Sequence, residues 1–386
     1  MDERNRGQIQ IESYREDFPI TKSHIYLDHA GVAPVSSRVI RKVEKFLKEA
    51  AESAIIRYQY WMDRVQEVRT NCARLIGSQP EELAFVKNTS HGLSIVAEGL
   101  DWKYGDNLLV YEREFPSNAY TWLNLERRGV RVKVVPYQDG KILAEDIERL
   151  IDSRTRLLAI SSVQFSNGFK VDLKTLGELC KEKGILFCVD AIQSLGVVPM
   201  DVKEFGIDFL SADGHKWLLA PEGTGIFYCR NALAERINPP LIGWKSILNE
   251  SEYDRLDFDL KGNTLRFEEG SLNVMGIYAL GAAVDLILEA GIDNIESGVL
   301  ELGDLIIEEA ERRGFEVRTP KNRDERAGIV SFVGDFDPLE IKDKLRAMSV
   351  VVNVRGGALR ISPHFYNTKD DILSLFDAMD RVLRLR

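Results

Sequence analysis

The stretch Ile207 to Cys229 reads IDFLSADGHKWLLAPEGTGIFYC. Two short apolar runs, Ile207 to Leu210 and Ile226 to Cys229, flank a segment in which Lys216 lies between a histidine and a tryptophan. Similar apolar runs come earlier in the chain, at 108–111, 132–135, 156–161 and 185–190. Short strands that are apolar on both faces and alternate with helices are typical of a mostly parallel sheet with crossover helices. The sequence therefore predicts an α/β layer architecture.

Helical patterns separate several of these runs. They cover Asn118 to Arg128, Ala144 to Ile151 and Leu173 to Lys183.

The last third of the chain has a different pattern. A long run of helix formers, from Asn273 to Arg313, precedes the strand-like segments FEVRT, GIVSFVG and ALRIS and a final helix from about Lys369. This order predicts a smaller α+β unit. We expect a large α/β domain over residues 25–270 and a small C-terminal domain over 271–386, with the N-terminal segment 1–24 packing on the small one.

Composition excludes several classes of protein. The 386 residues include 51 basic and 61 acidic side chains, for a net charge of -10, and no window collects the lysines and arginines that would follow a nucleic-acid backbone. The charged N-terminus lacks the apolar core of a signal peptide, and no window offers 18 uncharged apolar residues. Four scattered cysteines form no CxxC pair. We expect a cytoplasmic enzyme without nucleic-acid, membrane or metal partners.

Polar residues that directly follow an apolar run are the first candidates for a ligand site, because open α/β sheets bind ligands beyond the carboxyl ends of their strands. One such segment is NTSHG, Asn88 to Gly92, which opens a helix. Free backbone amides and the helix dipole favour a phosphate there, and Ser90 adds a hydroxyl. The alternative is that Thr89 or Ser90 only caps the helix.

Two further strand ends carry polar side chains. Asn167 lies in the turn FSNG, where an asparagine can serve the turn alone. Asp190 ends the run ILFCVD, and Gln193 follows it. A carboxylate at the end of a buried strand requires a positive partner, which is either a protonated ring nitrogen or a neighbouring lysine or arginine.

Lys216 completes this set. A partly desolvated lysine at a strand end has a lowered amine pKa, which suits Schiff-base chemistry. A phosphate-binding helix start, an acid for a pyridine nitrogen and a lysine are the groups that a pyridoxal 5'-phosphate (PLP) enzyme needs. By contrast, no GxGxxG follows the early strands, which argues against a nicotinamide-binding fold.

Five ordered motifs resemble the class V aminotransferases, a fold-type I PLP group that includes cysteine desulfurases and isopenicillin N epimerases. They span nearly the whole chain: HIYLDHAGVAP (24–34), VDAIQSLG (189–196), SADGHKWLLAPEGTG (211–225), RFEEGSLN (266–273) and LRISPHFYNTKDDI (359–372). The resemblance implies a large domain with a mostly parallel seven-stranded sheet, a small α+β domain, a small amino-acid substrate and a homodimer with shared active sites.

The resemblance also implies roles for individual residues. Lys216 would form the Schiff base and move the Cα proton, with Asp190 on the pyridine nitrogen. The remaining cofactor contacts would come from Ser90, the backbone at His91, Asn167, Gln193, Asp213, His215 and, from the partner subunit, Ser271. His215 would also belong to the catalytic set. Arg360 would bind the substrate carboxylate, assisted by Asn167 and Arg57.

Four departures from the family pattern bear on the reaction. VVVNVRGGALR (350–360) lacks the cysteine that desulfurases carry on a loop just before the C-terminal arginine. EFPSN (114–118) replaces the stacking histidine, so that Phe115 or Pro116 would cover the ring. IIRYQYW (55–61) keeps an arginine but no histidine, and Asp213 stands where the family has a serine. A carboxylate so close to a phosphate would repel it unless it is turned away or neutralised.

We therefore expect a PLP-dependent aminotransferase or lyase of class V that acts at Cα of a small α-amino acid. The alternative is a cysteine desulfurase or carbon-sulfur lyase that uses no loop cysteine. A third hypothesis, a non-catalytic relative, predicts a damaged lysine, aspartate or arginine, and Lys216, Asp190 and Arg360 are all present.

Overall fold

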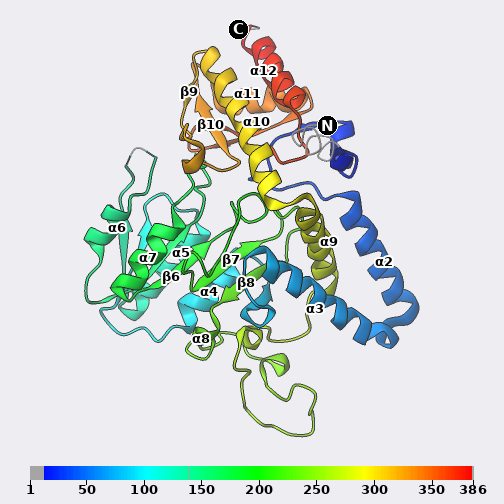
Figure 1. Ribbon diagram of the computed structural model, residues 1–386, viewed down its shortest axis with the longest axis vertical. Coiled ribbons are helices and arrows are strands. Elements are labelled where there is room, and N and C mark those ends of the chain that lie inside the picture. Colours follow the sequence, from blue (N-terminus) through cyan, green and yellow to red (C-terminus); the bar gives the residue numbers. More distant parts are fainter. Residues whose placement is uncertain (1–12, 139, 385–386) are drawn as a thin grey trace, which may run out of the picture.

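The computed structural model describes residues 13–138 and 140–384, and a seven-stranded sheet forms its centre (Figure 1). The strand order is β2-β8-β7-β6-β5-β3-β4. β8 is antiparallel to both of its neighbours, and the other adjacent pairs are parallel. The strands are β2 (Leu83–Val86), β3 (Asn107–Tyr111), β4 (Arg131–Val135), β5 (Thr155–Ser161), β6 (Leu186–Asp190), β7 (Phe209–Asp213) and β8 (Gly225–Cys229). The predicted, mostly parallel seven-stranded sheet is confirmed.

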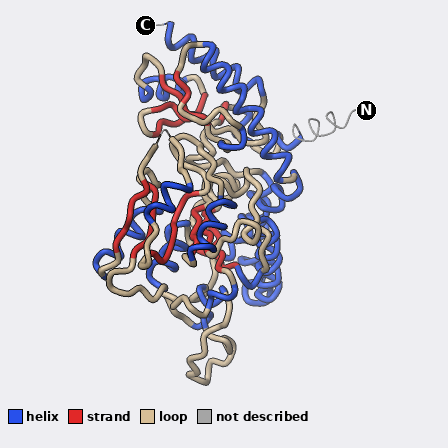
Figure 2. The backbone as a smooth tube through the Cα atoms, turned by 60° about the vertical axis from the view of Figure 1, so that its left-hand side comes forward, coloured by secondary structure: helices blue, strands red, loops and turns tan. Residues whose placement is uncertain are grey.

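Helices cover both faces of this sheet (Figure 2). Successive residues of β3 point to opposite faces, so that Leu108 enters one hydrophobic core and Leu109 the other. Both faces are therefore apolar, which explains the continuous apolar runs in the sequence. The helices of this part are α2 (Ser37–Ser53), α3 (Tyr58–Leu75), α4 (Thr89–Gly99), α5 (Ser117–Leu123), α6 (Ala144–Leu150), α7 (Leu173–Lys183), α8 (Asn231–Ala234) and α9 (Val274–Ala290).

The helical patterns of the sequence correspond closely to these helices. The pattern at 118–128 is α5 followed by a 3-10 helix, Asn124–Arg128. The run at 273–313 is two helices, α9 and α10 (Ile292–Arg312), which meet at Gly291 with a bend of 80°. Hydrophobic periodicity does not reveal this bend, because both helices are apolar toward a core.

A second sheet of four antiparallel strands forms the C-terminal part, in the order β12-β13-β10-β9. β11 of this part pairs in parallel with β1 from the start of the chain. These residues enclose a hydrophobic core of their own. The elements are β1 (Ile25–Tyr26), β9 (Glu316–Val317), β10 (Val330–Val333), α11 (Pro338–Ala347), β11 (Val350–Val351), β12 (Asn353–Arg355), β13 (Ala358–Ile361) and α12 (Lys369–Arg384).

The proposed N-terminal segment 1–24 falls only partly within the described residues, because residues 1–12 lie outside them. Phe18 stacks on Tyr366 with 3.8 Å between the ring centroids, and Arg15 forms two hydrogen bonds with Asp371. These contacts favour the proposed packing on the C-terminal part. The boundary at residue 270 also stays a proposal, and α9 packs against α2 and α3 beside the large sheet (Figure 1).

Within the two described ranges no single helix is long and apolar enough to cross a membrane. Helices α9 and α10 meet the requirements of length and composition only as a bent pair.

The sheet places the candidate residues at one edge. β6 ends at Asp190, and β7 ends at Asp213 and leads directly to Lys216. Helices α4 and α5 begin just beyond the carboxyl ends of β2 and β3. Since these strands point the same way, all of these groups gather beyond the carboxyl edge of the sheet.

A buried ion pair ties α3 to this sheet. Arg69 donates to both oxygens of Glu268, at 2.7 and 3.0 Å, and to the carbonyl oxygen of Leu83. Glu268 also accepts from the backbone amide of Phe85 at 2.8 Å. Both charged side chains are almost fully buried, with exposed fractions of 2% and 6%. Removal of one partner therefore leaves an uncompensated charge in the interior.

We expect Glu268→Ala to lower the free energy of unfolding by about 3–5 kcal/mol, because Arg69 remains buried without its partner. Urea denaturation of the two proteins measures the difference. Glu204→Ala is the control, since the Lys174–Glu204 pair is exposed and contributes at most about 1 kcal/mol. Equal effects of the two substitutions would contradict the assignment.

Candidate active site

A cavity of about 290 Å³ lies where the carboxyl edge of the sheet meets the C-terminal part. Its walls come from the N-terminal segment, the segments after β3, β5, β6 and β7, and the β12–β13 hairpin. The lining residues are Tyr26, Asp28, Ala30, Gly31, Val32, Phe115, Phe165, Gln193, His215, Lys216, Asn353, Arg355 and Arg360. The cavity thus joins segments that are more than 300 residues apart in the sequence.

Lys216 is the one lysine among the described residues that line this cavity, and it is buried. Its amine lies 5.2 Å from the centre of the Phe115 ring. Burial lowers the pKa of Lys216 to about 8, and the positive charges of Arg360 and Arg355 act in the same direction. Asp190 opposes this effect. A substantial fraction of the amine is therefore neutral near pH 8, which is the form that attacks a carbonyl.

Asp190 is buried at the end of β6, and one of its oxygens accepts a hydrogen bond from the backbone amide of Ile192. Burial raises the pKa of Asp190 to about 6, while that hydrogen bond and Lys216 lower it. Gln193 is held nearby, since it donates to the carbonyl oxygen of Ala30 and accepts from the indole of Trp217. Asp190 is thus a buried carboxylate whose negative charge is not fully balanced by a neighbouring cation.

The start of α4 keeps two backbone amides free. Asn88 caps the helix by accepting from the amide of His91, so neither Thr89 nor Ser90 is the capping residue. Among residues 13–138 and 140–384, no group accepts from the amides of Thr89 and Ser90. The Ser90 hydroxyl donates to Ser117, at the start of α5. Free amides, a hydroxyl and the positive end of the helix dipole suit a phosphate group.

His91 does not share this arrangement. The Asn88 cap occupies its amide, and its side chain lines another cavity together with Ser271. The predicted phosphate contact of the His91 backbone stays a prediction, and it requires that amide to leave the cap.

Asp213 replaces the serine of the family pattern, and its carboxylate contacts the two residues that follow it. One of its oxygens accepts from the amide of Gly214 at 2.7 Å, and the other lies 3.0 Å from Nδ1 of His215. Its backbone amide donates to the hydroxyl of Thr89. Its carboxylate is thus occupied by the backbone of Gly214 and lies beside the imidazole of His215.

Two hydrogen bonds hold the guanidinium of Arg360. One of its terminal nitrogens donates to Asp28 at 2.9 Å, and the other donates to the carbonyl oxygen of Phe165. The described residues offer no hydrogen-bond acceptor to its Nε. Burial lowers the pKa of Arg360, and Asp28 raises it. The sequence did not identify Asp28, although it belongs to the quoted segment HIYLDHAGVAP.

A second arginine, Arg355, also lines the cavity, and the sequence analysis missed it. Arg355 ends β12, and Gly356 and Gly357 form the turn into β13 with φ of 56° and 75°. Two consecutive positive φ values define a type I′ hairpin turn, which glycine adopts without strain. In the sequence, an arginine directly before two glycines could have indicated a side chain fixed by a tight turn. This tight turn holds Arg355 in the wall of the cavity. Only its two glycines connect β12 to β13.

Seven predicted site residues are absent from the lining of this cavity. Asp190, Ser90, His91 and Asp213 lie at the strand and helix ends described above, and the other three are Asn167, Arg57 and Ser271. Both polar atoms of Asn167 are engaged, by the carbonyl oxygen of Gly140 and the amide of Phe169. Arg57 is half exposed beside Glu49, and its guanidinium lies over the ring of Tyr60. Ser271 lies in the other cavity with His91. The structure of one chain therefore brings Lys216, Gln193, His215 and Arg360 together, but not these three.

The residues around Lys216 fit PLP. Asp190 is a buried acid in need of a positive partner, the start of α4 offers free amides, and the amine of Lys216 forms no hydrogen bond within the described parts of the chain. Of the two residues expected to cover the ring, Phe115 lines the cavity, and its edge packs against Phe165.

Comparison with known proteins agrees with this geometry. Residues 25–375 match the family described as aminotransferase class-V. The chain belongs to the class-V aminotransferase family. A probable cysteine desulfurase of Methanothermobacter thermautotrophicus is 32% identical, over 97% of this chain and 98% of that protein. An uncharacterized aminotransferase of Bacillus subtilis, YcbU, is 29% identical, over 95% and 96%.

A solved structure shows the same fold. The apo cysteine desulfurase from Thermococcus onnurineus NA1 superimposes with a TM-score of 0.89 at 27% identity, over 97% of this chain and 98% of that one. This class-V protein is a PLP-dependent enzyme, as the sequence predicted.

We expect Asp190→Asn to stabilise the PLP-free protein and to weaken PLP binding. The folded-state pKa of Asp190, about 6, lies above its unfolded value, so its charge destabilises the folded protein above pH 6. Asparagine removes a cost of up to about 3 kcal/mol at pH 8, and this gain shrinks as the pH falls through 6. Thermal unfolding at several pH values and PLP titration measure both effects. A destabilised variant with unchanged PLP affinity would refute the role of Asp190.

Proposed function

We propose that this class-V enzyme labilises the Cα–H bond of a small α-amino acid and completes a transamination or a β-elimination. One observation carries the proposal: a single cavity of about 290 Å³ contains a buried lysine with a lowered pKa and a buried arginine with a free Nε. That volume suits a small amino acid beside a cofactor rather than a polymer.

Arg360 binds the substrate carboxylate in this proposal. Its Nε has no partner among the described residues, and each terminal nitrogen keeps a second N–H beside the one that it donates to Asp28 or Phe165, so that the guanidinium can offer the paired donors that match a carboxylate. Asp28 holds the guanidinium in place and keeps it charged. The substrate carboxylate therefore fixes the amino acid with its Cα toward Lys216.

Lys216 then removes and returns the Cα proton. Bound PLP supplies an electron sink, which lowers the cost of removing that proton. A pKa of about 8 suits the lysine for general acid–base work near neutral pH. Phe115, in the place of the family's histidine, brings no acid or base to the cavity, so that Lys216 acts without a second group on that side.

The cysteines of the chain favour a reaction without sulfur transfer to the enzyme. All four are buried outside the cavity, and burial raises the pKa of each thiol far above its usual value. The Gly356–Gly357 turn occupies the place of the cysteine loop of desulfurases. A persulfide on this enzyme's own cysteine is therefore not part of the proposal.

A carbon-sulfur lyase is the second candidate function. The relatives that are named cysteine desulfurases favour a sulfur-containing amino acid as substrate. β-Elimination from such a substrate needs the proton transfer by Lys216 and no enzyme thiol. The lyase differs from the β-elimination proposed above only in its sulfur leaving group, and it differs from a transamination in that a β-substituent leaves.

We further propose a homodimer with shared active sites. Arg57 and Ser271 were expected at the substrate and the phosphate, but they lie outside their own chain's cavity. Ile56 and Leu256 belong to apolar side chains that one chain leaves exposed, to 85% and 101%. A second copy that covers these side chains can bring Arg57 and Ser271 to the partner's site.

Arg360→Lys is expected to reduce kcat/KM for the amino-acid substrate about 10- to 150-fold, because a lysine cannot form the paired hydrogen bonds. The loss should lie mainly in KM, since the carboxylate is bound throughout the reaction. Arg318→Lys, at an exposed position of the C-terminal part, is the control. Unchanged kinetics of Arg360→Lys would rule out its role as the carboxylate clamp.

A screen of amino acids with separate assays of keto acid, ammonia and sulfide identifies the reaction. Amino-group transfer to an added keto acid indicates transamination, and keto acid with ammonia indicates elimination. Sulfide with pyruvate supports the lyase candidate. Alanine together with sulfur bound to the enzyme would contradict the proposal.

A further inference from the structure

A second and larger cavity, of about 670 Å³, lies at the opposite edge of the central sheet. It is lined by residues at the amino ends of β5, β6 and β7, by the segment after β8, and by the C-terminal end of α7. β7 separates the two cavities along its length, because Asp208 precedes this strand and Lys216 follows it. The catalytic residues proposed above take no part in this cavity.

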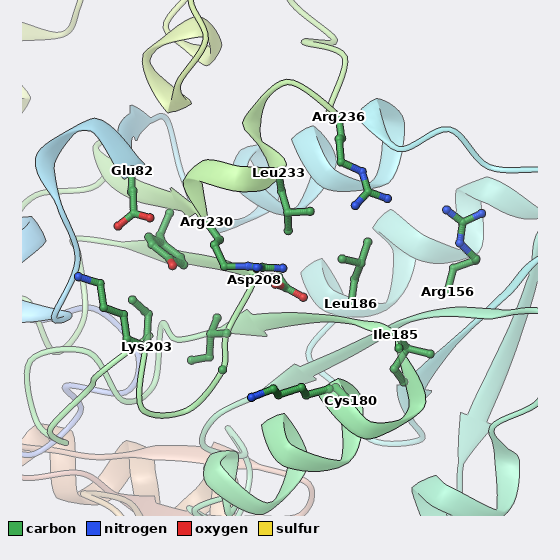
Figure 3. Close-up of a pocket in the computed structure, with 16 residues that line it drawn as sticks. Glu82, Arg156, Cys180, Ile185, Leu186, Lys203, Asp208, Arg230, Leu233 and Arg236 are labelled. Carbon is green, nitrogen blue, oxygen red and sulfur yellow. Dashed lines mark hydrogen bonds and ion pairs between the residues drawn. The ribbon is translucent and has the colours of Figure 1, made fainter.

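Basic side chains outnumber acidic ones in its lining, by five to two. The five, Arg156, Lys181, Lys203, Arg230 and Arg236, come from four segments of the chain, since Arg230 and Arg236 both follow β8. Figure 3 shows the guanidinium groups of Arg156, Arg230 and Arg236 around Leu186 and Leu233. A protein with a net charge of -10 therefore carries a cationic hollow on this edge.

Much of this positive charge is not neutralised. Within residues 13–138 and 140–384, the side chains of Lys181, Lys203 and Arg236 form neither a hydrogen bond nor an ion pair. Arg230 uses only its Nε, which donates to Asp208 at 2.7 Å, so its two terminal nitrogens remain available. Arg156 uses one terminal nitrogen, which donates to Asp106.

The two acidic residues of the lining, Asp208 and Glu82, accept hydrogen bonds from the protein's own backbone. Asp208 accepts from the backbone amide of Phe187 at 3.0 Å in addition to Arg230. Glu82 accepts from the backbone amides of Gln79 and Asn231. Both carboxylates are nearly buried, so the groups that face solvent in this cavity are cationic.

The floor of the cavity is apolar, and this determines the kind of anion. Ile185, Tyr228 and Leu233 are buried there, and Leu186 is half-buried. Guanidinium groups match the oxygens of a phosphate through paired hydrogen bonds, and an apolar floor takes an uncharged ring or chain. A volume of 670 Å³ lies in the range of small-molecule sites.

We propose that this cavity binds a small organic phosphate, with its phosphate groups on Arg230, Arg236 and Arg156 and its apolar body on Leu186 and Leu233. The contact is electrostatic in large part, so that binding weakens as the salt concentration rises. This site is independent of the reaction at Lys216, because different residues at another edge of the sheet form it.

Isothermal titration of the PLP-loaded enzyme with ADP, pyrophosphate and adenosine in low salt tests this proposal. PLP occupies the phosphate site near α4, so the probes report on the second cavity. We expect ADP to bind at micromolar concentrations, pyrophosphate to bind at least about tenfold more weakly because it lacks the apolar body, and adenosine not to bind.

Arg236→Ala removes an exposed guanidinium that forms no hydrogen bond or ion pair within the described residues, and the variant should fold normally. We expect it to weaken ADP binding at least about tenfold, with the loss of a charged phosphate contact. Arg131→Ala, at an exposed arginine of β4 outside the cavity, should bind ADP like the parent. The PLP absorbance of each variant verifies that it is folded and loaded.

Three results would overturn the proposal: no binding of ADP at low salt, equal binding by the parent and Arg236→Ala, or equal affinities for ADP and pyrophosphate. The last result would indicate a general attraction of anions. Binding of an acidic peptide without binding of ADP would assign the same surface to a protein partner and would also refute the organic-phosphate site.

Discussion

Two opposite charges, the amine of Lys216 and the carboxylate of Asp190, are withdrawn from water at the carboxyl edge of the central sheet. Burial moves their pKa values toward each other, to about 8 and about 6, and their mutual attraction opposes this movement. Neither group is stable alone at such a depth. The rest of the site follows from this constraint, because a bound cationic ring is the partner that Asp190 lacks and the neutral amine is what Lys216 needs to react.

The fold maintains this costly arrangement through its two cores. β6 and β7 are buried on both faces, so their ends are fixed in position. Asp190 and Lys216, which lie at or just after these ends, are therefore fixed as well. The C-terminal part then closes the cavity with Arg360, which Asp28 links to the N-terminal segment. Both ends of the chain therefore meet at the substrate side of the site, whereas the middle of the chain provides the cofactor side.

The sequence predicted the features that depend on local pattern. Continuous apolar runs predicted the sheet, and the polar residues after them indicated Asp190, Gln193 and Lys216. Features that depend on long-range packing could not be predicted. The contact of Asp28 with Arg360 joins residues 332 positions apart, and the Asn88 cap took an amide expected to bind phosphate. The cationic cavity could not be predicted either, because its five basic residues come from four separate segments and form no run.

Reductive trapping of the Schiff base tests the central claim most directly. The enzyme is mixed with PLP over a range of pH, reduced with borohydride and digested, and the modified residue is located by mass spectrometry. We predict that PLP is attached to Lys216, that the rate of attachment rises with a midpoint near pH 8, and that Lys216→Ala gives no adduct. Attachment to another lysine, or a midpoint near the usual lysine pKa of about 10.4, would contradict it.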